Sequence, residues 1–223
     1  MNIEVNTCYP HYYPSLTILR NEYLIAIGGF KSKKCEYYSI TNKKWKELPE
    51  LPEERYGASA ICDNTYNIVY LFGGLNTKTN KCCMSILKLN VNTCVKWDTI
   101  VMIDNSECLA KMNQVLIKKD DGRLLIIGGE DSEGKRTDDI IEIDLRIKVF
   151  KPKIHNKKLQ RKPKFQSMRF AVASSTGFIY MLDDDEEGDM NIVHRIDDSF
   201  TSILYLDDTN VKGNIFKGKA SKL

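Results

Sequence analysis

Three times along this chain, a run of apolar residues ends in a pair of glycines. The runs are Leu24–Gly29, Tyr70–Gly74 and Leu124–Gly129, and their first glycines stand 45 and then 55 residues apart. Each run is short, rich in Ile, Leu and Tyr, and bounded by turn residues, which is typical of a buried β-strand. Similarity at such a period indicates a stack of equivalent supersecondary units. The sequence therefore predicts a repeat protein built from β-strands.

A glycine pair after a strand also occurs in α/β proteins that bind dinucleotides. That fingerprint needs G-x-G-x-x-G at the start of a helix within a βαβ unit. None of the three pairs continues in this way, because each is followed by a polar loop and another strand-like run. Glycine here instead permits positive φ and lets another backbone approach closely. The pairs therefore do not indicate a dinucleotide site.

The similarity continues beyond each glycine pair. A polar loop leads to a strand-like run, and an aromatic residue follows on the next strand after a short turn. The paired positions are Tyr38 and Trp45, Leu89 and Trp97, and Ile143 and Phe150, separated by seven, eight and seven residues. The repeating unit is thus a set of four strands.

With these residues aligned, the chain resembles the Kelch-repeat family over roughly residues 15–151. The resemblance implies an all-β fold, a β-propeller of about four four-stranded antiparallel blades. It also implies that the glycine pairs allow tight packing and that the aromatic residues pack between blades. By resemblance, these structural roles fall to Gly28, Gly29, Tyr38, Trp45, Gly73, Gly74, Leu89, Trp97, Gly128, Gly129, Ile143 and Phe150.

A fourth, degenerate repeat follows. Residues 168–173 resemble residues 55–60, the first strand of the second repeat. Residues 178–182 parallel the strands before the glycine pairs, but Asp183 and Asp184 occupy the glycine places. The last two strands are expected at 191–196 and 200–206.

One domain is predicted, because four repeats occupy nearly all of the 223 residues. We expect an N-terminal strand and crossover at 1–14, repeats at about 15–52, 53–104, 105–151 and 165–206, a basic crossover at 151–164, and a basic tail at 207–223. Propellers typically close with about four to eight blades. Either the N-terminal strand at 2–8 closes a small ring, or the chain is an incomplete ring from a larger propeller, which we prefer. An open end would leave an unpaired strand edge and favour self-association.

Composition disfavours several classes of protein. No stretch of about eighteen apolar residues occurs, so no membrane span is expected. The N-terminus lacks the basic and apolar regions of a secretory signal. Seven cysteines without a repeated C-x₂-C pair favour free thiols in a reducing cytoplasm. The net charge of +3 is too mild to argue for nucleic acid.

The sequence shows no catalytic, cofactor-binding or metal-binding constellation. His11, His155 and His194 lie in unrelated places, and no Ser/His/Asp set or paired carboxylates stand out. A zinc site is poorly supported because no histidine lies near paired cysteines. The acidic run 183–189 lacks the spacing of a calcium loop. We therefore predict a non-enzyme that needs no cofactor or metal.

The leading hypothesis is a non-catalytic interaction module, a scaffold or adaptor for a protein or peptide partner. Stacked blades bury their strands and leave variable loops for recognition. The loop after each glycine pair is expected to share a face with the crossover to the next blade, and that face carries most partner contacts in the family. The partner-binding candidates are Lys31, Lys33, Lys34, Arg55, Tyr56, Arg136 and Arg169.

Two roles stay open for Arg55 and Arg169, which begin equivalent strands. Their guanidinium groups would grip a carboxylate or phosphate on a partner peptide, or anchor carbonyl groups of their own loops. The basic segment 148–164 is likewise either a docking site for an acidic partner, phosphate or nucleic acid, or a solvated loop. Its flanking aromatics, Phe150 and Phe165, are too sparse for stacking on bases.

Two alternatives to the interaction module stay open. Some Kelch-like propellers are copper oxidases or sugar isomerases, but a copper site needs convergent His and Tyr ligands, and the three histidines here are dispersed. The second alternative is a non-functional fragment of a larger Kelch protein.

Overall fold

The described part of the chain is built from antiparallel β-sheets. The computed structural model describes residues 6–100, 109–119, 122–146 and 152–154, together with the backbone of the strands at 171–173, 178–183, 192–197 and 203–206. Four sheets have four strands each, and one further sheet is a two-stranded hairpin. No helix within these residues is long and apolar enough to cross a membrane.

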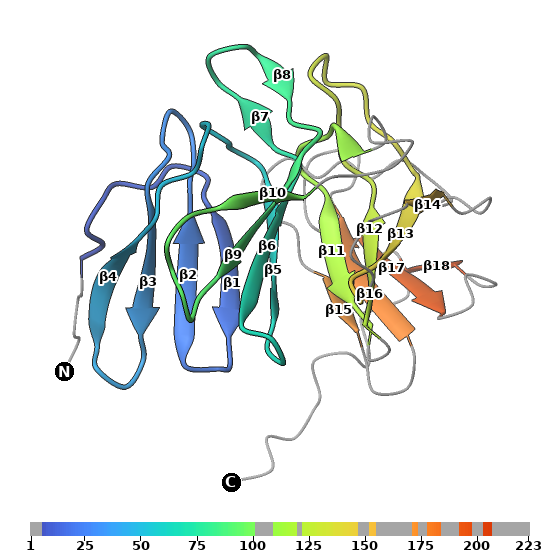
Figure 1. Ribbon diagram of the computed structural model, residues 1–223. Helices are drawn as coiled ribbons and strands as arrows, with labels where there is room; N and C mark the ends of the chain where they lie inside the picture. Colours follow the sequence, from blue (N-terminus) through green and yellow to red (C-terminus); the bar gives the residue numbers. More distant parts are fainter. Residues whose placement is uncertain are drawn as a thin grey trace, which may run out of the picture.

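Each four-stranded sheet is formed by strands that follow one another along the chain (Figure 1). The first contains β1 (Ser15–Leu19), β2 (Tyr23–Ile27), β3 (Cys35–Ser39) and β4 (Lys44–Leu48). The second contains β5 (Ser59–Asp63), β6 (Ile68–Phe72), β9 (Ile86–Asn90) and β10 (Asp98–Ile100), with the hairpin β7 (Leu75–Asn76) and β8 (Lys81–Cys82) inserted. The third contains β11 (Val115–Lys118), β12 (Arg123–Ile127), β13 (Ile140–Asp144) and β14 (Lys153–Ile154). The fourth contains β15 (Ala171–Ala173), β16 (Phe178–Asp183), β17 (Ile192–Asp197) and β18 (Ile203–Leu206).

The predicted all-β class with antiparallel four-stranded units is confirmed. The degenerate fourth repeat also forms a four-stranded sheet, although β16 ends on an aspartate where the other repeats have glycine. The hairpin β7–β8 was not expected from the sequence. It lengthens the loop between the second and third strands of the second repeat.

The structure differs from the sequence-based prediction at the N-terminal strand and at the end of the third repeat. The strand expected over 2–8 lies partly outside the described residues, and residues 6–8 form no strand. In the third sheet, β14 lies beyond residue 151, because the pairing is set by Ile141 opposite Ile154. The third repeat therefore extends into the segment expected to be the basic crossover. Phe150 lies outside the described residues.

The first strands of the sheets pack against one another in sequence order. β1 packs on β5, β5 on β11, and β11 on β15. Figure 1 shows the sheets following one another across the molecule. Among the described strands, no packing of comparable extent joins β15 back to β1. The structure therefore shows a series of four sheets but no closed ring.

Both faces of the second sheet are buried, which explains the continuous apolar run in β6. Val69 and Leu71 belong to a core cluster shared with the first sheet. Tyr70 and Phe72 belong to a second cluster, shared with β12 and β13 of the third sheet. Successive side chains of a strand point to opposite faces. A strand between two packed sheets therefore needs apolar residues at every position.

The glycine pairs mark the points where neighbouring repeats come closest. The Gly29 N–H donates to the Arg55 carbonyl (3.0 Å), and the Gly74 N–H donates to the Lys111 carbonyl (2.9 Å). Gly73 has a φ of +58°, and a Cβ added there would overlap the Lys111 carbonyl oxygen. Glycine is therefore required at this position, because its φ is positive and no room is left for a Cβ atom.

We predict that Gly73→Ala lowers the free energy of unfolding by about 3–5 kcal/mol, because it combines backbone strain with overpacking against a main chain that cannot rotate away. Gly134→Ala is the matched control. Gly134 also has a positive φ (+79°), but nothing lies within 4 Å of its Cβ position, so strain alone costs about 1 kcal/mol. Urea unfolding followed by tryptophan fluorescence measures both. If both variants lost the same free energy of unfolding, the close approach of Gly73 to the Lys111 carbonyl would be contradicted.

Candidate partner-binding face

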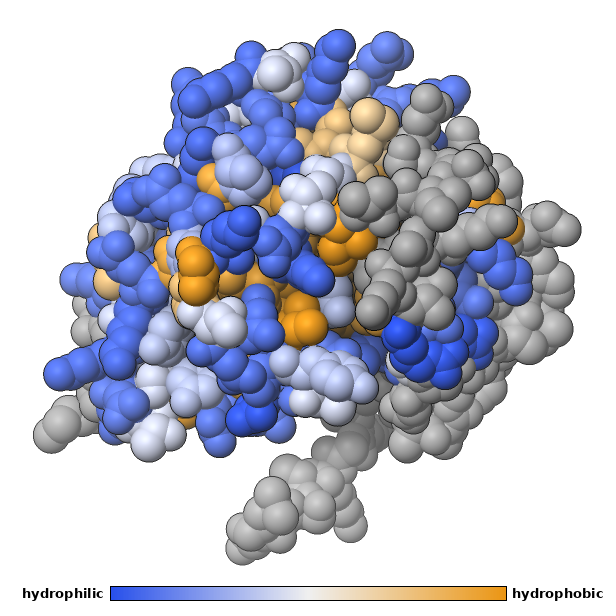
Figure 2. Space-filling model, in the orientation of Figure 1, coloured by the Kyte–Doolittle hydropathy of each residue, from blue (hydrophilic) through white to orange (hydrophobic). Residues whose placement is uncertain are grey.

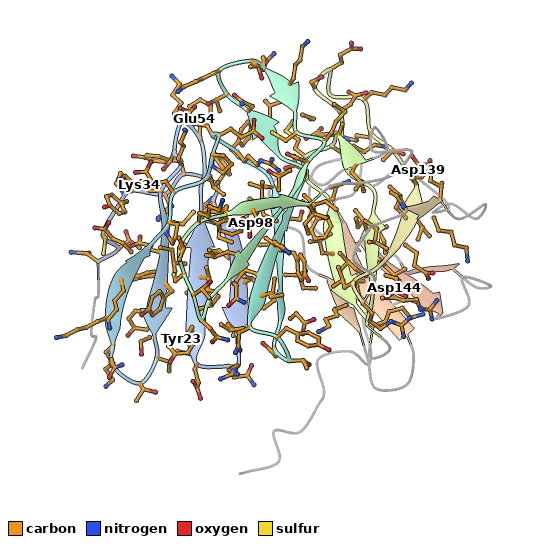
Figure 3. The ribbon with its side chains drawn as sticks, viewed as in Figure 1. Tyr23, Lys34, Glu54, Asp98, Asp139 and Asp144 are labelled. Carbon is orange, nitrogen blue, oxygen red and sulfur yellow. The ribbon has the colours of Figure 1, made fainter. Side chains whose placement is uncertain are left out.

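The loop of the first repeat and the crossover to the second lie at the same end of the sheets. The Leu51 N–H donates to the Lys33 carbonyl (2.9 Å), which joins the crossover 49–58 to the loop 28–34. Figure 3 shows Lys34 and Glu54 at this end and Tyr23 at the opposite end. This is the face on which the sequence places the partner-binding candidates, and we call it the loop face.

A second hydrogen bond recurs in each of the first three repeats. The residue after the glycine pair donates its N–H to the crossover that leads into its own repeat. Phe30 donates to Tyr12 (2.7 Å), Leu75 to Tyr56 (2.8 Å) and Glu130 to Met112 (2.9 Å). Each crossover is thereby fixed to the loop beside it. The loop face is a set of hydrogen-bonded segments, which limits the conformational entropy lost on binding.

Arg55 lies inside the molecule and not at its rim. Its side chain is 0 % exposed. Nη1 donates to the carbonyls of Gly73 (3.2 Å) and Ser85 (2.7 Å), and Nη2 donates to the Ser85 hydroxyl (2.5 Å) and the Glu53 carboxylate (2.6 Å). These contacts correspond to the anchoring role that the sequence left open, and we assign Arg55 to it.

His11 and Lys111 occupy the positions equivalent to Arg55, directly before the crossover residues Tyr12 and Met112. The Lys111 ammonium donates to the Asp139 carboxylate (3.2 Å). The His11 ring contacts the Gly28 carbonyl (2.9 Å) and the Glu36 carboxylate (2.8 Å).

Each of these three side chains therefore reaches the glycine loop or third strand of its own repeat. The sequence comparison paired only Arg55 with Arg169, because three different residue types perform the same task. Arg169 lies outside the described residues.

Exposed aromatic side chains gather around the loop of the first repeat. Tyr12 is 64 % exposed and Phe30 is 45 % exposed. The rings of Phe30 and Tyr56 meet edge to face, with centroids 5.7 Å apart. The Lys34 ammonium lies 4.5 Å from the centre of the Tyr9 ring, and the Lys31 ammonium lies 5.3 Å from that of Phe30. We define the aromatic-basic patch as Tyr9, Tyr12, Phe30, Lys31, Lys34 and Tyr56.

The patch is hollowed at its centre. A depression of about 350 Å³ is lined by Tyr9, Pro10, Tyr12, Phe30, Lys31, Ser32 and Lys34. Figure 2, in the orientation of Figure 1, shows mostly hydrophilic residues over the described surface. On this part of the loop face, the exposed rings of Tyr12 and Phe30 border the depression.

The lysines of this face are not equivalent. Lys34 pairs with Glu50 (2.6 Å), and this hydrogen bond raises the pKa of Lys34 and lowers that of Glu50. The Lys33 ammonium donates to the Pro52 carbonyl (2.8 Å). Lys31 is exposed and forms no ion pair with any residue in the described ranges. It is therefore the cation of the patch that stays available to an acidic group.

The structure brings together some of the predicted residues and separates others. Lys31, Lys34 and Tyr56 belong to the patch, and Lys33 lies beside it. Arg136 lies in the loop of the third repeat, where its backbone forms an isolated antiparallel β-bridge with that of Glu130.

Tyr9, Tyr12 and Phe30 were not predicted from the sequence as site residues. The available signal was the aromatic crossover Cys8–Tyr13 together with an aromatic residue directly after a glycine pair.

No group of three or more His, Cys, Asp or Glu side chains is arranged to hold a metal ion within the residues the structure describes.

Comparison with known proteins gives a partial similarity. No known family profile matches the chain. Over 73 residues, the chain is 34 % identical to a Kelch repeat-containing protein of Dictyostelium discoideum. The match covers 30 % of this chain and 11 % of that protein, so the chain spans a small part of this relative. The similarity and the four antiparallel sheets together fit a Kelch-like family.

We predict that Arg55→Ala lowers the free energy of unfolding by about 3 kcal/mol or more, because it removes four hydrogen bonds and leaves buried acceptors without a donor. Lys31→Ala, which removes an exposed cation from the adjacent loop, should stay within about 0.5 kcal/mol of the parent protein. Urea unfolding curves of the two variants provide the comparison. Wild-type stability in Arg55→Ala would show that this side chain does not anchor the loop.

Proposed function

We propose that this chain is a non-catalytic interaction module of Kelch type, whose four sheets are blades of a propeller and whose loop face captures a protein or peptide partner. The observation that carries the proposal is the aromatic-basic patch. Four antiparallel four-stranded sheets and a similarity to a Kelch repeat-containing protein support the architecture. The patch supplies a surface on which recognition takes place.

Its chemistry suits a protein partner. Aromatic side chains are enriched at the energetic centres of interfaces, because they bury a large area at a low cost in conformational entropy. Tyr12 and Phe30 are exposed, while their backbones are joined by a hydrogen bond of 2.7 Å. The anchors are therefore held in place before binding, which favours affinity.

The patch also indicates what the partner carries. The depression between Tyr9, Tyr12 and Phe30 accommodates an apolar or proline side chain. Lys31, which forms no ion pair among the described residues, offers a cation at its margin. We therefore propose a peptide segment in which an apolar residue is followed or preceded by a carboxylate. Such a charge pair at the rim contributes orientation more than affinity.

A reducing compartment such as the cytoplasm is proposed for this module. The six cysteines in the described ranges are free thiols. Burial raises the pKa of Cys35 and of Cys83 to about 12, so these thiols stay protonated and behave as small apolar core residues.

The test is selection of binding peptides from a phage-displayed random library on the full chain. We expect selected peptides to lose at least about tenfold in affinity for Tyr12→Ser/Phe30→Ser, since interface anchors contribute more than about 1.4 kcal/mol. The control is Tyr66→Ser/Val95→Ser, which removes two side chains that are 66 % and 75 % exposed and lie outside the patch. The control variant should bind the selected peptides with the same affinity as the parent protein. Undiminished binding to the patch variant would place the partner site elsewhere.

A further inference from the structure

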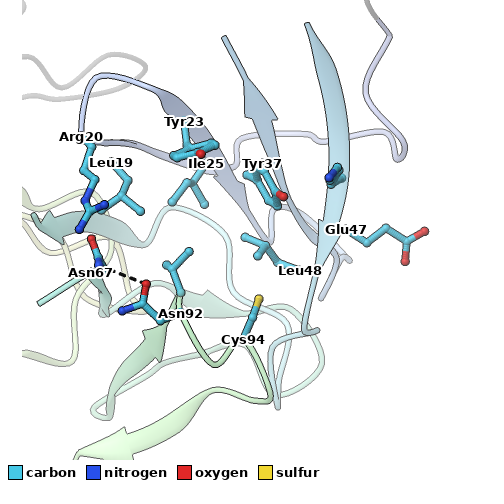
Figure 4. A pocket seen from close by; sticks show the side chains of 12 residues that line it. Leu19, Arg20, Tyr23, Ile25, Tyr37, Glu47, Leu48, Asn67, Asn92 and Cys94 are labelled. Carbon is cyan, nitrogen blue, oxygen red and sulfur yellow. Dashed lines mark hydrogen bonds between the residues drawn. The ribbon is translucent and has the colours of Figure 1, made fainter. Parts of the chain in front are cut away.

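A second hollow lies between the first and second sheets, at the end opposite the loop face (Figure 4). Its volume is about 400 Å³. One wall comes from the strands of the first sheet, and the other comes from the turns that join β5 to β6 and β9 to β10. Cavities of this size are typical of sites for small organic molecules.

The hollow originates in a change of spacing in the second repeat. Leu89 and Trp97 are eight residues apart, whereas the other repeats have seven. β10 pairs with β9 only along Ile86–Lys88, while β4 pairs with β3 over five residues. The segment 91–96 therefore runs as a loop along the face of the first sheet. Trp97 ends this loop, and its indole N–H donates to the Pro49 carbonyl (2.9 Å).

The interior of this pocket is apolar and aromatic. Leu19, Ile25 and Leu48 form its base, with exposures of 2 %, 1 % and 7 %. The rings of Tyr23 and Tyr37 meet edge to face, with centroids 5.5 Å apart and an interplanar angle of 83°. Figure 4 shows both tyrosines on the sheet side of the pocket. A planar ring is the shape that such a surface accepts best.

Two asparagines at the side of the pocket leave an acceptor unused. The Asn67 amide donates to the Asn92 side-chain oxygen (3.2 Å). Asn67 is only 8 % exposed, and its own Oδ1 has no hydrogen-bond partner. A buried acceptor without a donor costs about 1–3 kcal/mol. An N–H or O–H group of a ligand at this end would remove that cost.

The charges at the pocket are unbalanced. Arg20 and Lys46 line it, and both are exposed and without an acidic partner among the residues of the described ranges. Glu47 also lines the pocket, but it interacts with the Tyr9 hydroxyl, whose pKa it raises. Figure 4 shows Glu47 pointing away from the pocket and Arg20 directed toward Asn67. Two cations therefore remain to attract an anion.

We propose that this pocket binds a small aromatic carboxylate. The ring packs between the tyrosine pair and the aliphatic base, and the carboxylate lies near Arg20, while Lys46, from β4 at the other edge of the first sheet, adds positive charge to the pocket. A donor on the ring reaches the unpaired oxygen of Asn67. This site is separate from the aromatic-basic patch and does not depend on the proposed partner function.

The probe is indole-3-acetate, which combines a planar ring, an N–H donor and a carboxylate. A titration of the full chain followed by amide ¹H–¹⁵N spectra should give saturable shifts at Ile25, Asn67 and residues 91–94. Arg20→Ala/Lys46→Ala should weaken binding about tenfold by removing both cations. The control Lys81→Ala/Lys135→Ala removes two exposed lysines elsewhere and should bind as the parent does.

Two further comparisons make the assignment specific. Tryptophol, which keeps the indole but replaces the carboxylate with an alcohol, should bind weakly and should not distinguish the charge variant from the parent. Val91→Trp, which fills the pocket from its loop wall, should abolish the shifts while the thermal unfolding temperature is retained. Shifts confined to the loop face, equal affinity for the charge variant, or no saturable shift would each overturn the proposal.

Discussion

Backbone hydrogen bonds at the glycine pairs determine how this molecule is assembled. The N–H of Gly29 and that of Gly74 each donate to a carbonyl of the next crossover, at 3.0 Å and 2.9 Å. A side chain at Gly73 would overlap the Lys111 carbonyl, so the absence of a Cβ permits the contact. The first sheet is thereby joined to the second, and the second to the third, at one end, beside the buried apolar strands β2 and β6. These junctions act together with the apolar clusters that the first and second sheets share and that the second and third sheets share.

The two ends of the sheets have different properties as a consequence. At the glycine end, the crossovers are hydrogen-bonded to the loops, and buried or half-buried basic residues such as Arg55 and Lys111 reinforce them. Exposed aromatic rings at this end project from a fixed backbone. At the other end, neighbouring sheets are joined by the Arg20 N–H, which donates to the Asn64 side chain (3.0 Å), and by the ion pair between Lys118 and Asp63 (3.1 Å). The early departure of the chain after β9 leaves a hollow at this end. The two binding sites that we propose, one for a protein partner and one for a small molecule, therefore lie at opposite ends of the same sheets.

Much of the fold could be predicted because its signals are local. An apolar run before two glycines identifies the second strand of a repeat, and the run at 178–182 did so even with aspartate in the glycine places. The hairpin β7–β8 could not be predicted in this way, because its strands have two residues each and show no alternation. The burial of Arg55 also escaped prediction. A charged residue is expected at the surface, and only the folded chain brings the Gly73 and Ser85 carbonyls to it. The aromatic-basic patch is similarly formed by crossover and loop residues that are distant in sequence.

If the glycine pairs join the sheets into one unit, these junctions must be as stable as the sheets themselves. Native-state hydrogen exchange of the Gly29 and Gly74 amides measures this directly, since both lie outside the strands. We predict that these amides exchange with the same free energy of opening as those in the centres of β2 and β6, as expected for one cooperative unit. Exchange at the rate of an open loop, while the strands remain protected, would show that the sheets are held together without these bonds.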